Sequence, residues 1–252
     1  MAEPIVDQQY WDAGYAGHKL AYSPEQIQFK EIFAQYLPRG GEGGVRSCFE
    51  VGCYPGSYLI YLGKEFGYEA NGIDLTPRTA AEFAEYLRGN GVTVGKIERG
   101  DFFEFAPERQ YDLVCSFGFV EHFADYEEVI RRHAALVKAG GTLVLSAPNF
   151  RGLQGVLHAL LDKPNLDRHV LGSMNLRRWR GALERCGMQV VHEGYYRTFD
   201  FWTDHPTASR GSRWLAMRIA GAGRRVDRMV HWPNRFTSPY MISVARKEGP
   251  HE

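Results

Sequence analysis

The residues with the clearest chemical potential surround a glycine-containing turn. The segment Cys48–Ser57 reads as an apolar strand that runs into Gly52, with a helix beginning just after Gly56. In an open parallel sheet, ligands bind beyond the carboxyl ends of the strands. Gly52 permits a tight turn, and the first amide groups of the helix can donate to a polar or anionic group. The turn is therefore a candidate ligand site.

The side chains of this turn indicate which kind of ligand it can bind. A dinucleotide-binding turn needs the pattern G-x-G-x-x-G, whose middle glycine makes room for a pyrophosphate, and Tyr54 stands at that position. Glu50, near the end of the strand, adds negative charge that suits an aminium and a sulfonium and disfavours a diphosphate. S-adenosylmethionine carries both cations and no phosphate. We therefore predict that ligand, with a plain glycine turn beside a solvated glutamate as the alternative.

Two further acids follow later predicted strands. Asp74 ends the second strand, eighteen residues after Gly56, close to the spacing of about 20 residues at which an acid meets ribose hydroxyls. Asp101 follows the third strand, where its carboxylate can accept from an adenine amino group while Phe102 packs against the ring. The alternatives are that Asp74 only caps the helix that starts near Pro77 and that Asp101 only closes a turn.

An alternation of strands and helices must hold these residues in place. Such alternation predicts one parallel sheet covered by helices on both faces. The predicted strands are Ser47–Gly52, Ala70–Leu75, Val92–Ile97, Tyr111–Phe117, Gly141–Ala147, Met188–Val191 and Ser238–Ala245. The predicted helices are one from Pro24 up to the breaker Pro38, Ser57–Phe66, Pro77–Leu87, Tyr126–Val137 and Leu176–Cys186.

The second half of the chain is less regular. Asn149–Gly172 looks loop-like around one short apolar run, and Ser209–Trp232 looks helical but broken by Gly221 and Gly223. No repeat or long linker divides the chain. We expect a single domain over residues 1–252, with an N-terminal helical cap (1–45), a cofactor-binding half (46–147) and an acceptor-side half (148–252) that contains a helical insertion at about 209–232.

In this order and spacing, the signals resemble a class I S-adenosylmethionine-dependent methyltransferase, of the branch that includes quinone-biosynthesis and sugar or glycan O-methyltransferases. The matching features are an E-x-G-x-x-x-G turn that starts at Glu50, the strand-end Asp74, Gly100-Asp101, Tyr111-Asp112-Leu113-Val114 followed by Glu121-His122, and Gly140–Ser146. The resemblance implies an α/β, Rossmann-like fold of seven mostly parallel strands with helices on both faces and the last strand antiparallel. Tyr54 replaces a commoner glycine, which puts the local loop shape in question.

The resemblance also implies a reaction and a cofactor. The cofactor is S-adenosyl-L-methionine, and the expected acceptor is a small molecule or glycan that is O-methylated, with N-methylation behind it. The alternatives are a catalytically silent S-adenosylmethionine-binding protein and a nucleotide-dependent oxidoreductase on a similar fold. The expected cofactor-binding residues are Glu50, Gly52, Cys53, Tyr54, Gly56, Asp74, Leu75, Asp101, Phe102, Ser116 and Phe117.

His122 is the candidate catalytic base. An imidazole titrates near neutral pH, and this one follows the fourth strand, whose end should border the first turn. In related methyltransferases this histidine acts as the base in some and only shapes the pocket in others. His158, His169 and His205 lie in the half that should cover the acceptor and are weaker candidates. No histidine or carboxylate cluster has metal-ligand spacing, so no metal is expected.

Two segments leave alternatives open. Tyr10, Trp11, Tyr15 and Tyr22 either fold over the cofactor as a lid or belong to an N-terminal packing helix. Between residues 209 and 232, six arginines accompany a partial apolar seam and the acid Asp227; they are Arg210, Arg213, Arg218, Arg224, Arg225 and Arg228. Such a segment either contacts an anionic membrane or an acidic or lipid-linked acceptor, or is a solvated helix packed on the sheet.

Composition indicates which classes of partner and which cellular compartment to expect. Thirty basic and thirty acidic residues give a formal net charge of zero, which argues against nucleic acid as a partner. Cys48, Cys53, Cys115 and Cys186 form no C-x-x-C pair, so buried thiols in a reducing compartment are expected. The chain starts without a signal-like layout and lacks an apolar run of roughly 18 residues. We therefore expect a soluble, cytoplasmic protein.

Overall fold

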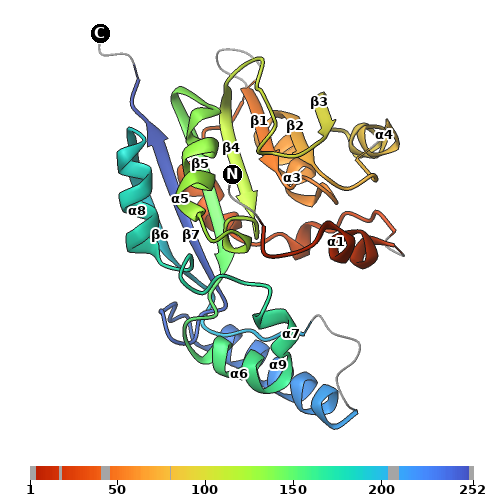
Figure 1. Cartoon of the computed structure of the whole chain (residues 1–252), viewed down its shortest axis with the longest axis vertical. Coiled ribbons are helices and arrows are strands. Elements are labelled where there is room, and N and C mark those ends of the chain that lie inside the picture. The colour runs from red at the N-terminus through yellow and green to blue at the C-terminus, as the bar shows by residue number, and fades with distance from the viewer. Residues whose placement is uncertain (1–3, 17–18, 41–45, 80, 204–209, 250–252) are drawn as a thin grey trace.

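A seven-stranded sheet forms the centre of the computed structural model, which describes residues 4–16, 19–40, 46–79, 81–203 and 210–249 (Figure 1). The strand order is β3-β2-β1-β4-β5-β7-β6. β7 runs antiparallel to both of its neighbours, and the other pairs are parallel. The strands are β1 (Arg46–Val51), β2 (Tyr68–Asp74), β3 (Val94–Arg99), β4 (Tyr111–Phe117), β5 (Val137–Pro148), β6 (Met188–Tyr196) and β7 (Tyr240–Lys247). The predicted Rossmann-like fold with an antiparallel last strand is confirmed.

Helices cover both faces of this sheet. On one face, α2 (Lys30–Tyr36), α3 (Ser57–Phe66) and α4 (Ala81–Gly89) pack into one apolar core. On the other, α5 (Tyr126–Ala135) and α8 (Leu176–Arg185) pack into a second core. The remaining elements are α1 (Gln8–Tyr15), α6 (Leu153–Leu161), α7 (Lys163–Leu166), α9 (Arg210–Met229) and two short 3₁₀ turns, η1 (Pro24–Gln26) and η2 (Val120–His122). Among the described helices, none combines the length and apolarity that crossing a bilayer requires.

Side chains of the central strands alternate between the two cores. In β4, Leu113 and Cys115 belong to the core under α3, and Val114 belongs to the core under α5, because successive strand side chains face opposite sides. Burial on both faces explains why β4 reads as a continuous apolar run. Cys48 and Cys115 face each other across adjacent strands with their Sγ atoms 3.7 Å apart, and all four cysteines are free thiols.

Helices α6, α7 and α9 form a separate lobe beyond the end of the sheet (Figure 1). The prediction of a loop over 149–172 was wrong, because α6 and α7 lie within that segment. Leu157 and Leu161 of α6 pack against a small core made by Phe201, Ala216 and Ala220. Tertiary packing therefore stabilises α6. Its sequence is too short, and its flanks too polar, for a helix to be predicted from the sequence alone.

Helix α9 is continuous, so the break predicted at Gly221 and Gly223 is absent. A Cβ placed on Gly223 would lie 2.3 Å from the ring of Phe199, so this glycine allows a close approach between α9 and the chain after β6. The side chain of Asp227 accepts from the backbone of Thr198 at 2.6 Å and ties the same two segments together.

The N-terminal helix predicted from Pro24 is interrupted. Its first turn is the 3₁₀ turn η1, and α2 begins only after Phe29, whose φ is 63°. The ring of Phe29 is buried against Phe33 and Tyr196. Burial of this side chain offsets the cost of a left-handed conformation in a residue other than glycine.

Candidate functional site

A cavity of about 590 Å³ opens at the carboxyl ends of β1 to β4. It lies where the strand order reverses between β1 and β4, which is the place where open α/β sheets bind ligands. Most of the predicted cofactor-binding residues line it, namely Glu50, Gly52, Cys53, Tyr54, Gly56, Asp74, Leu75, Asp101, Phe102 and Phe117. The exception is Ser116, which is fully buried within β4.

The turn between β1 and α3 requires its two glycines. Gly52 and Gly56 have φ values of 73° and 87°, in the left-handed region that costs other residues about 1 kcal/mol or more. A Cβ on Gly56 would also lie 2.8 Å from the ring of Phe83. The ring of Tyr54 is buried against Phe83 instead of filling the cavity, so the departure from glycine at this position leaves room for a ligand.

Glu50 brings a buried acid to the floor of this cavity. Its side chain is 4% exposed, and Oε2 has no hydrogen-bond partner among the described residues. Burial, reinforced by the nearby Asp74, raises the pKa of Glu50 well above its ordinary value. An unpartnered buried carboxylate is costly, so this position favours a ligand with a positive charge. S-adenosylmethionine, with an aminium and a sulfonium and no phosphate, fits that requirement.

Two acids at the next strand ends are held by backbone amides. Asp74 accepts from the amides of Tyr54 at 3.1 Å and Thr76 at 2.9 Å, and Asp101 accepts from the amide of Phe103 at 2.8 Å. Both carboxylates line the cavity and keep further lone pairs. Asp74 thus closes its own turn and lines the cavity, and it does not cap the following helix, because α4 begins only at Ala81. Burial raises its pKa.

The N-terminal aromatic residues form one wall of the cavity. Trp11 and Tyr15, both on α1, line it, and the ring of Tyr15 lies 4.8 Å from that of Tyr54. Tyr22 instead packs near Lys64 on α3, away from the cavity. Helix α1 is fixed to the sheet edge by a hydrogen bond from Thr76 Oγ1 to Asp12 at 3.1 Å.

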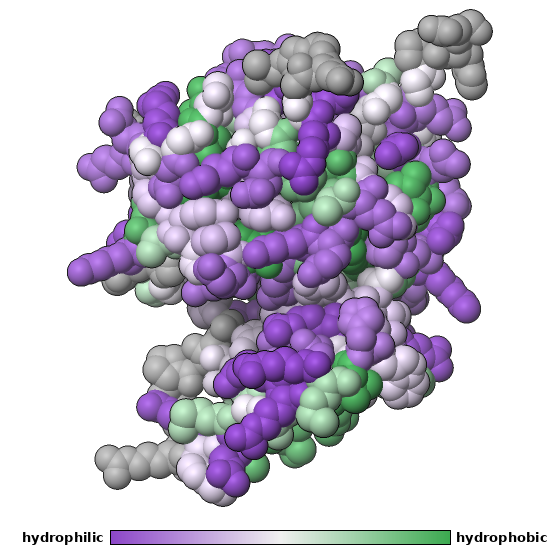
Figure 2. Space-filling model, turned by 180° about the vertical axis from the view of Figure 1, so that it is seen from behind, coloured by the Kyte–Doolittle hydropathy of each residue, from purple (hydrophilic) through white to green (hydrophobic). Residues whose placement is uncertain are grey.

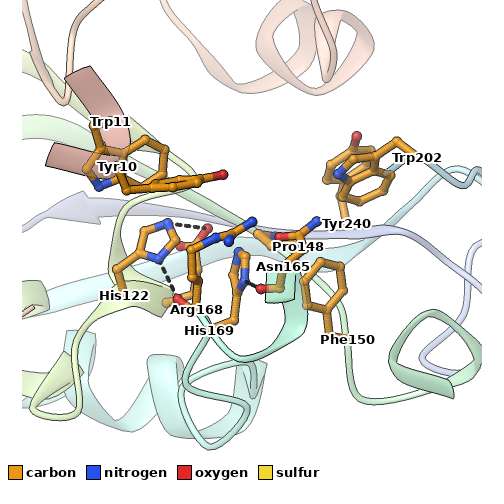
Figure 3. A pocket seen from close by; sticks show the side chains of 12 residues that line it. Tyr10, Trp11, His122, Pro148, Phe150, Asn165, Arg168, His169, Trp202 and Tyr240 are labelled. Atoms are coloured by element: carbon orange, nitrogen blue, oxygen red, sulfur yellow. Dashed lines mark hydrogen bonds and ion pairs between the residues drawn. The ribbon is translucent and has the colours of Figure 1, made fainter. Parts of the chain in front are cut away.

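A second cavity of about 230 Å³ adjoins the first (Figure 3). Trp11, Gly118 and His122 line both cavities. The other lining residues of the second cavity come from α1, η2, the end of β5, the segment between β5 and α8, the chain after β6, and β7. They are Tyr10, Glu121, Pro148, Phe150, Asn165, Arg168, His169, Trp202 and Tyr240. Asn165 Nδ2 and Arg168 Nη2 are buried donors without a hydrogen-bond partner among the described residues.

His122 stands at the junction of the two cavities. Its Nδ1 lies 2.9 Å from the carbonyl oxygen of Arg168, and because a carbonyl only accepts, Nδ1 carries the proton. The other ring nitrogen, Nε2, therefore holds a lone pair when the ring is neutral. Burial, joined by the neighbouring His169, lowers the pKa of His122 to about 3. The ring is therefore neutral at pH 7. Its pKa lies well below the working pH, whereas a general base is most effective with a pKa near the working pH.

The other predicted histidines differ in where they lie relative to the two cavities. His169 lines the second cavity, and its ring lies 4.8 Å from that of His122. His158 is buried against Phe150 and lines neither cavity, and His205 lies outside the described residues. A backbone hydrogen bond of 2.8 Å from Val170 to the carbonyl of Glu121 brings the segment of His169 to η2.

Sequence reasoning missed most of the second cavity. Glu121 is predicted only as part of a family pattern, and Asn165, Arg168 and Trp202 are not among the predicted site residues. The one available signal was the run Asn165 to His169, where an amide, a guanidinium and an imidazole follow one another in an otherwise irregular segment.

Known methyltransferase sequences resemble part of this chain. Residues 22–193 match the model of a methyltransferase-domain family. A probable tocopherol O-methyltransferase of Oryza sativa subsp. japonica is 27% identical over 176 residues, which cover 68% of this chain and 48% of the relative. An ajmaline N-methyltransferase of Rauvolfia serpentina is 27% identical over 139 residues, 54% of this chain and 46% of the relative. The chain spans about half the length of these curated relatives.

Solved structures share the fold over nearly the whole chain. A methyltransferase of Thiobacillus denitrificans in complex with S-adenosyl-L-homocysteine is 17% identical, covers 97% of this chain and 99% of its own, and gives a TM-score of 0.57. A second methyltransferase, from Archaeoglobus fulgidus, is 20% identical with a TM-score of 0.55 and covers 96% of this chain and all of its own. At these identities the likeness bears on the fold alone.

Proposed function

Because the chain belongs to the methyltransferase-domain family of class I S-adenosylmethionine-dependent methyltransferases, we propose that it methylates an oxygen of a small polar acceptor held in the second cavity. The observation that carries this proposal is the junction of the two cavities at His122. A donor in the larger cavity and an acceptor in the smaller one would meet there without either ligand leaving its site.

The larger cavity supplies the groups that S-adenosylmethionine needs. The cofactor supplies a methyl group bound to a sulfonium, which is an excellent leaving group. Glu50 offers negative charge to its cationic part, Asp74 offers carboxylate oxygens to ribose hydroxyls, and Asp101 with Phe102 offers a polar and an apolar contact to adenine. The chain's own contribution is therefore chiefly to orient the donor and exclude water.

His122 is the side chain proposed to prepare the acceptor. Its Nε2 lone pair is available because Nδ1 donates to the carbonyl of Arg168. A hydroxyl that donates to Nε2 would have its oxygen directed toward the junction, and the imidazole can accept the hydroxyl proton as the oxygen attacks. The reaction needs orientation above all, since alignment alone can lower the barrier by several kcal/mol.

The walls of the second cavity favour a hydroxylated acceptor such as a sugar. Aromatic rings of Tyr10, Trp202 and Tyr240 offer flat apolar contacts, and the buried donors of Asn165 and Arg168 await acceptor oxygens. Buried donors without partners reject ligands that cannot satisfy them. An O-methylated glycan or natural product is therefore preferred over an apolar amine.

An acceptor screen tests this function directly. Release of S-adenosylhomocysteine would be measured across hydroxylated and amine acceptors, beside thermal shifts with S-adenosylmethionine, S-adenosylhomocysteine and NAD. We expect stabilisation by the first two ligands and turnover on hydroxylated acceptors. Stabilisation by NAD alone would overturn the assignment, binding without turnover on any acceptor would favour a silent binding protein, and turnover confined to amines would replace O-methylation by N-methylation.

The outer face of α9 supports a proposed contact with an anionic membrane surface. Trp214, Arg218, Arg225 and Met229 recur at helical spacing on one side of α9, with Trp232 just beyond its end. Trp214, Met229 and Trp232 are 59%, 85% and 67% exposed. Figure 2 shows apolar and hydrophilic side chains side by side over this lobe, at the bottom of the view. Interfacial helices combine exposed apolar side chains with a polar face rich in Lys or Arg, and α9 carries both kinds of side chain.

Vesicle sedimentation tests the membrane contact. We expect binding to vesicles that contain anionic lipid at low salt, weakened by Trp214→Ser with Trp232→Ser. The absence of binding even at low salt would leave α9 as a solvated helix. A cytoplasmic location stays a prediction, which the four free thiols, three of them buried, support.

A further inference from the structure

Three potential metal ligands converge where the two cavities meet. One ligand atom each from Glu121, His122 and His169 can be chosen so that all lie within 4.8 Å of one another. His122 Nε2 lies 4.0 Å from Glu121 Oε1. The side chains of His122 and His169 point into the same space, from η2 and from the segment after α7 (Figure 3). We propose that these three side chains bind a divalent transition-metal cation.

Both imidazoles are presented in the form that binds metals. Nδ1 of His122 lies 2.9 Å from the carbonyl of Arg168, and Nδ1 of His169 lies 2.7 Å from the carbonyl of Asn165. Each carbonyl fixes the proton on Nδ1 and leaves the Nε2 lone pair toward the cluster. Metal-binding histidines typically donate their second ring N–H to a carbonyl or carboxylate in this way.

The carboxylate of Glu121 needs a partner that the protein does not supply. Its side chain is 1% exposed, and Oε2 has no hydrogen-bond partner among the described residues. Glu121 is also the one acid among the described residues that line the second cavity. A buried carboxylate oxygen without a hydrogen bond is costly, and a bound cation removes that cost.

The ligand set and its spacing suit an open, catalytic type of site. Two imidazoles and one carboxylate match the three protein ligands of catalytic zinc sites, which leave a position open, and the facial triad of other transition metals. In a tetrahedral site, ligand atoms lie about 3.4 Å apart, so the three side chains must approach by roughly 1 Å. The hydrogen bond from Val170 to the carbonyl of Glu121 already fixes the two backbone segments.

Arg168 is the cationic side chain that faces the same cavity. Its guanidinium carbon lies 4.1 Å from the centre of the Tyr10 ring, so part of its charge is engaged there. Together with a divalent cation, this arginine would leave the cavity with a net positive charge. A cavity of that kind stabilises an acceptor oxygen as it becomes an alkoxide.

The proposed cation site rests on the proposed methyl transfer and gives His122 a different role in it. An acceptor hydroxyl bound at the open position would lose its proton to solvent more readily, because a cation lowers the pKa of a bound hydroxyl. The oxygen then forms a bond to the methyl carbon, and the carbon–sulfur bond breaks with its electron pair going to sulfur. His122 would hold the cation instead of taking the proton.

Titration with Mn²⁺ alone tests the site without needing an acceptor. The full chain, freed of metal with a chelator, would be titrated while free Mn²⁺ is followed by electron paramagnetic resonance, with Zn²⁺ as competitor. We expect one cation per chain, and affinity at least tenfold weaker in Glu121→Gln and in His169→Gln. His192→Gln, a half-buried histidine of β6, serves as the matched control and should bind as the wild type does. His169→Gln keeps the test valid should the buried Glu121→Gln not fold.

Absence of saturable binding of either cation, or binding that both variants leave unchanged, would overturn the inference. Activity separates this failure from failure of the proposed function. Chelation should lower turnover at least tenfold and leave S-adenosylhomocysteine binding unchanged, with recovery on adding Mn²⁺ or Zn²⁺. Full turnover in the chelator would overturn a catalytic cation while the proposed methyl transfer stands. Stoichiometric cation binding with no turnover on any acceptor would retain the site and count against the proposed reaction.

Discussion

The indole ring of Trp11 lies edge-on to the imidazole of His122, with 5.1 Å between the ring centroids. Both side chains line the larger cavity and the second cavity, so this pair forms part of the boundary between them. Trp11→Ala is expected to weaken binding of S-adenosylhomocysteine and to raise the acceptor KM, each by about threefold to tenfold, or about 1 kcal/mol. Calorimetry and initial rates would measure the two effects. Trp214→Ala, an exposed tryptophan on α9, is the control, and an effect on one ligand alone would contradict the shared boundary.

Glu50→Gln should weaken binding of the charged part of the cofactor and leave binding of its nucleoside part unchanged. The substitution keeps the shape of the side chain and removes the negative charge proposed to face the aminium and sulfonium. We expect binding of S-adenosylmethionine to weaken about tenfold, equal to about 1.4 kcal/mol, and binding of methylthioadenosine, which lacks both cations, to stay unchanged. Calorimetry with both ligands checks this. Equal losses for both would show that Glu50 acts only through the fold, and Glu82→Gln on the exposed face of α4 controls for net charge.

Gly56→Ala should destabilise the folded chain. Alanine at a φ of 87° is strained, and its Cβ would meet the rings and methyl groups of Phe83 and Leu87 within 3 Å. The expected loss is about 1–3 kcal/mol of the free energy of unfolding, measured by denaturant titration. Gly89→Ala is the matched control, because a Cβ there meets nothing within 4 Å. Similar losses in both variants would remove the steric argument.

His122→Ala should lower turnover by about 100-fold and change S-adenosylhomocysteine affinity less than twofold. The loss is expected whether the imidazole takes the acceptor proton or holds a cation, and the Mn²⁺ titration separates those roles. His231→Gln, an exposed histidine, is the control. Wild-type turnover in His122→Ala would remove the imidazole from the mechanism.

His133 should make stability depend on pH. Burial lowers the pKa of His133 in the folded chain to about 4, below the value of about 6.5 in an unfolded chain. Between these values the unfolded state binds more protons, so stability rises with pH and is lost as the pH falls from about 6.5 toward 4. The loss at about pH 5 should be about 2 kcal/mol. Denaturant titrations at both ends of this range should show a smaller pH dependence in His133→Phe, and His231→Gln should match the wild type.

The larger cavity could be predicted from sequence because its signals are local. Glu50, Gly52 and Gly56 lie within one turn, and Asp74 ends the next strand along the chain. The strand before the turn, β1, is mostly apolar because it is buried on both faces, so it can be located without help from distant segments. Ser116 was misplaced relative to the cavity because its neighbour Phe117, one position further along β4, is the residue that reaches the ligand space.

The second cavity could not be predicted because distant contacts build it. His122 and His169 meet through the backbone hydrogen bond between Val170 and Glu121, and a backbone bond leaves no trace in residue types. Spacing along the chain therefore does not indicate the cluster of Glu121, His122 and His169, which comes together only in the fold. Helix α6 was missed for a similar reason, because its partners Phe201 and Ala216 lie far along the sequence.

The small core between α6 and α9 has a consequence for how such enzymes diversify. Those helices pack on each other and not within the two cores that flank the sheet, so mutations that reshape the lobe spare the scaffold that captures the methyl donor. A lobe transplanted from a relative in two pieces, one between β5 and α8 and one between β6 and β7, should redirect the methyl group to that relative's acceptor. Selectivity for the acceptor would then evolve by exchange of the lobe, while the sheet and its flanking helices stay unchanged.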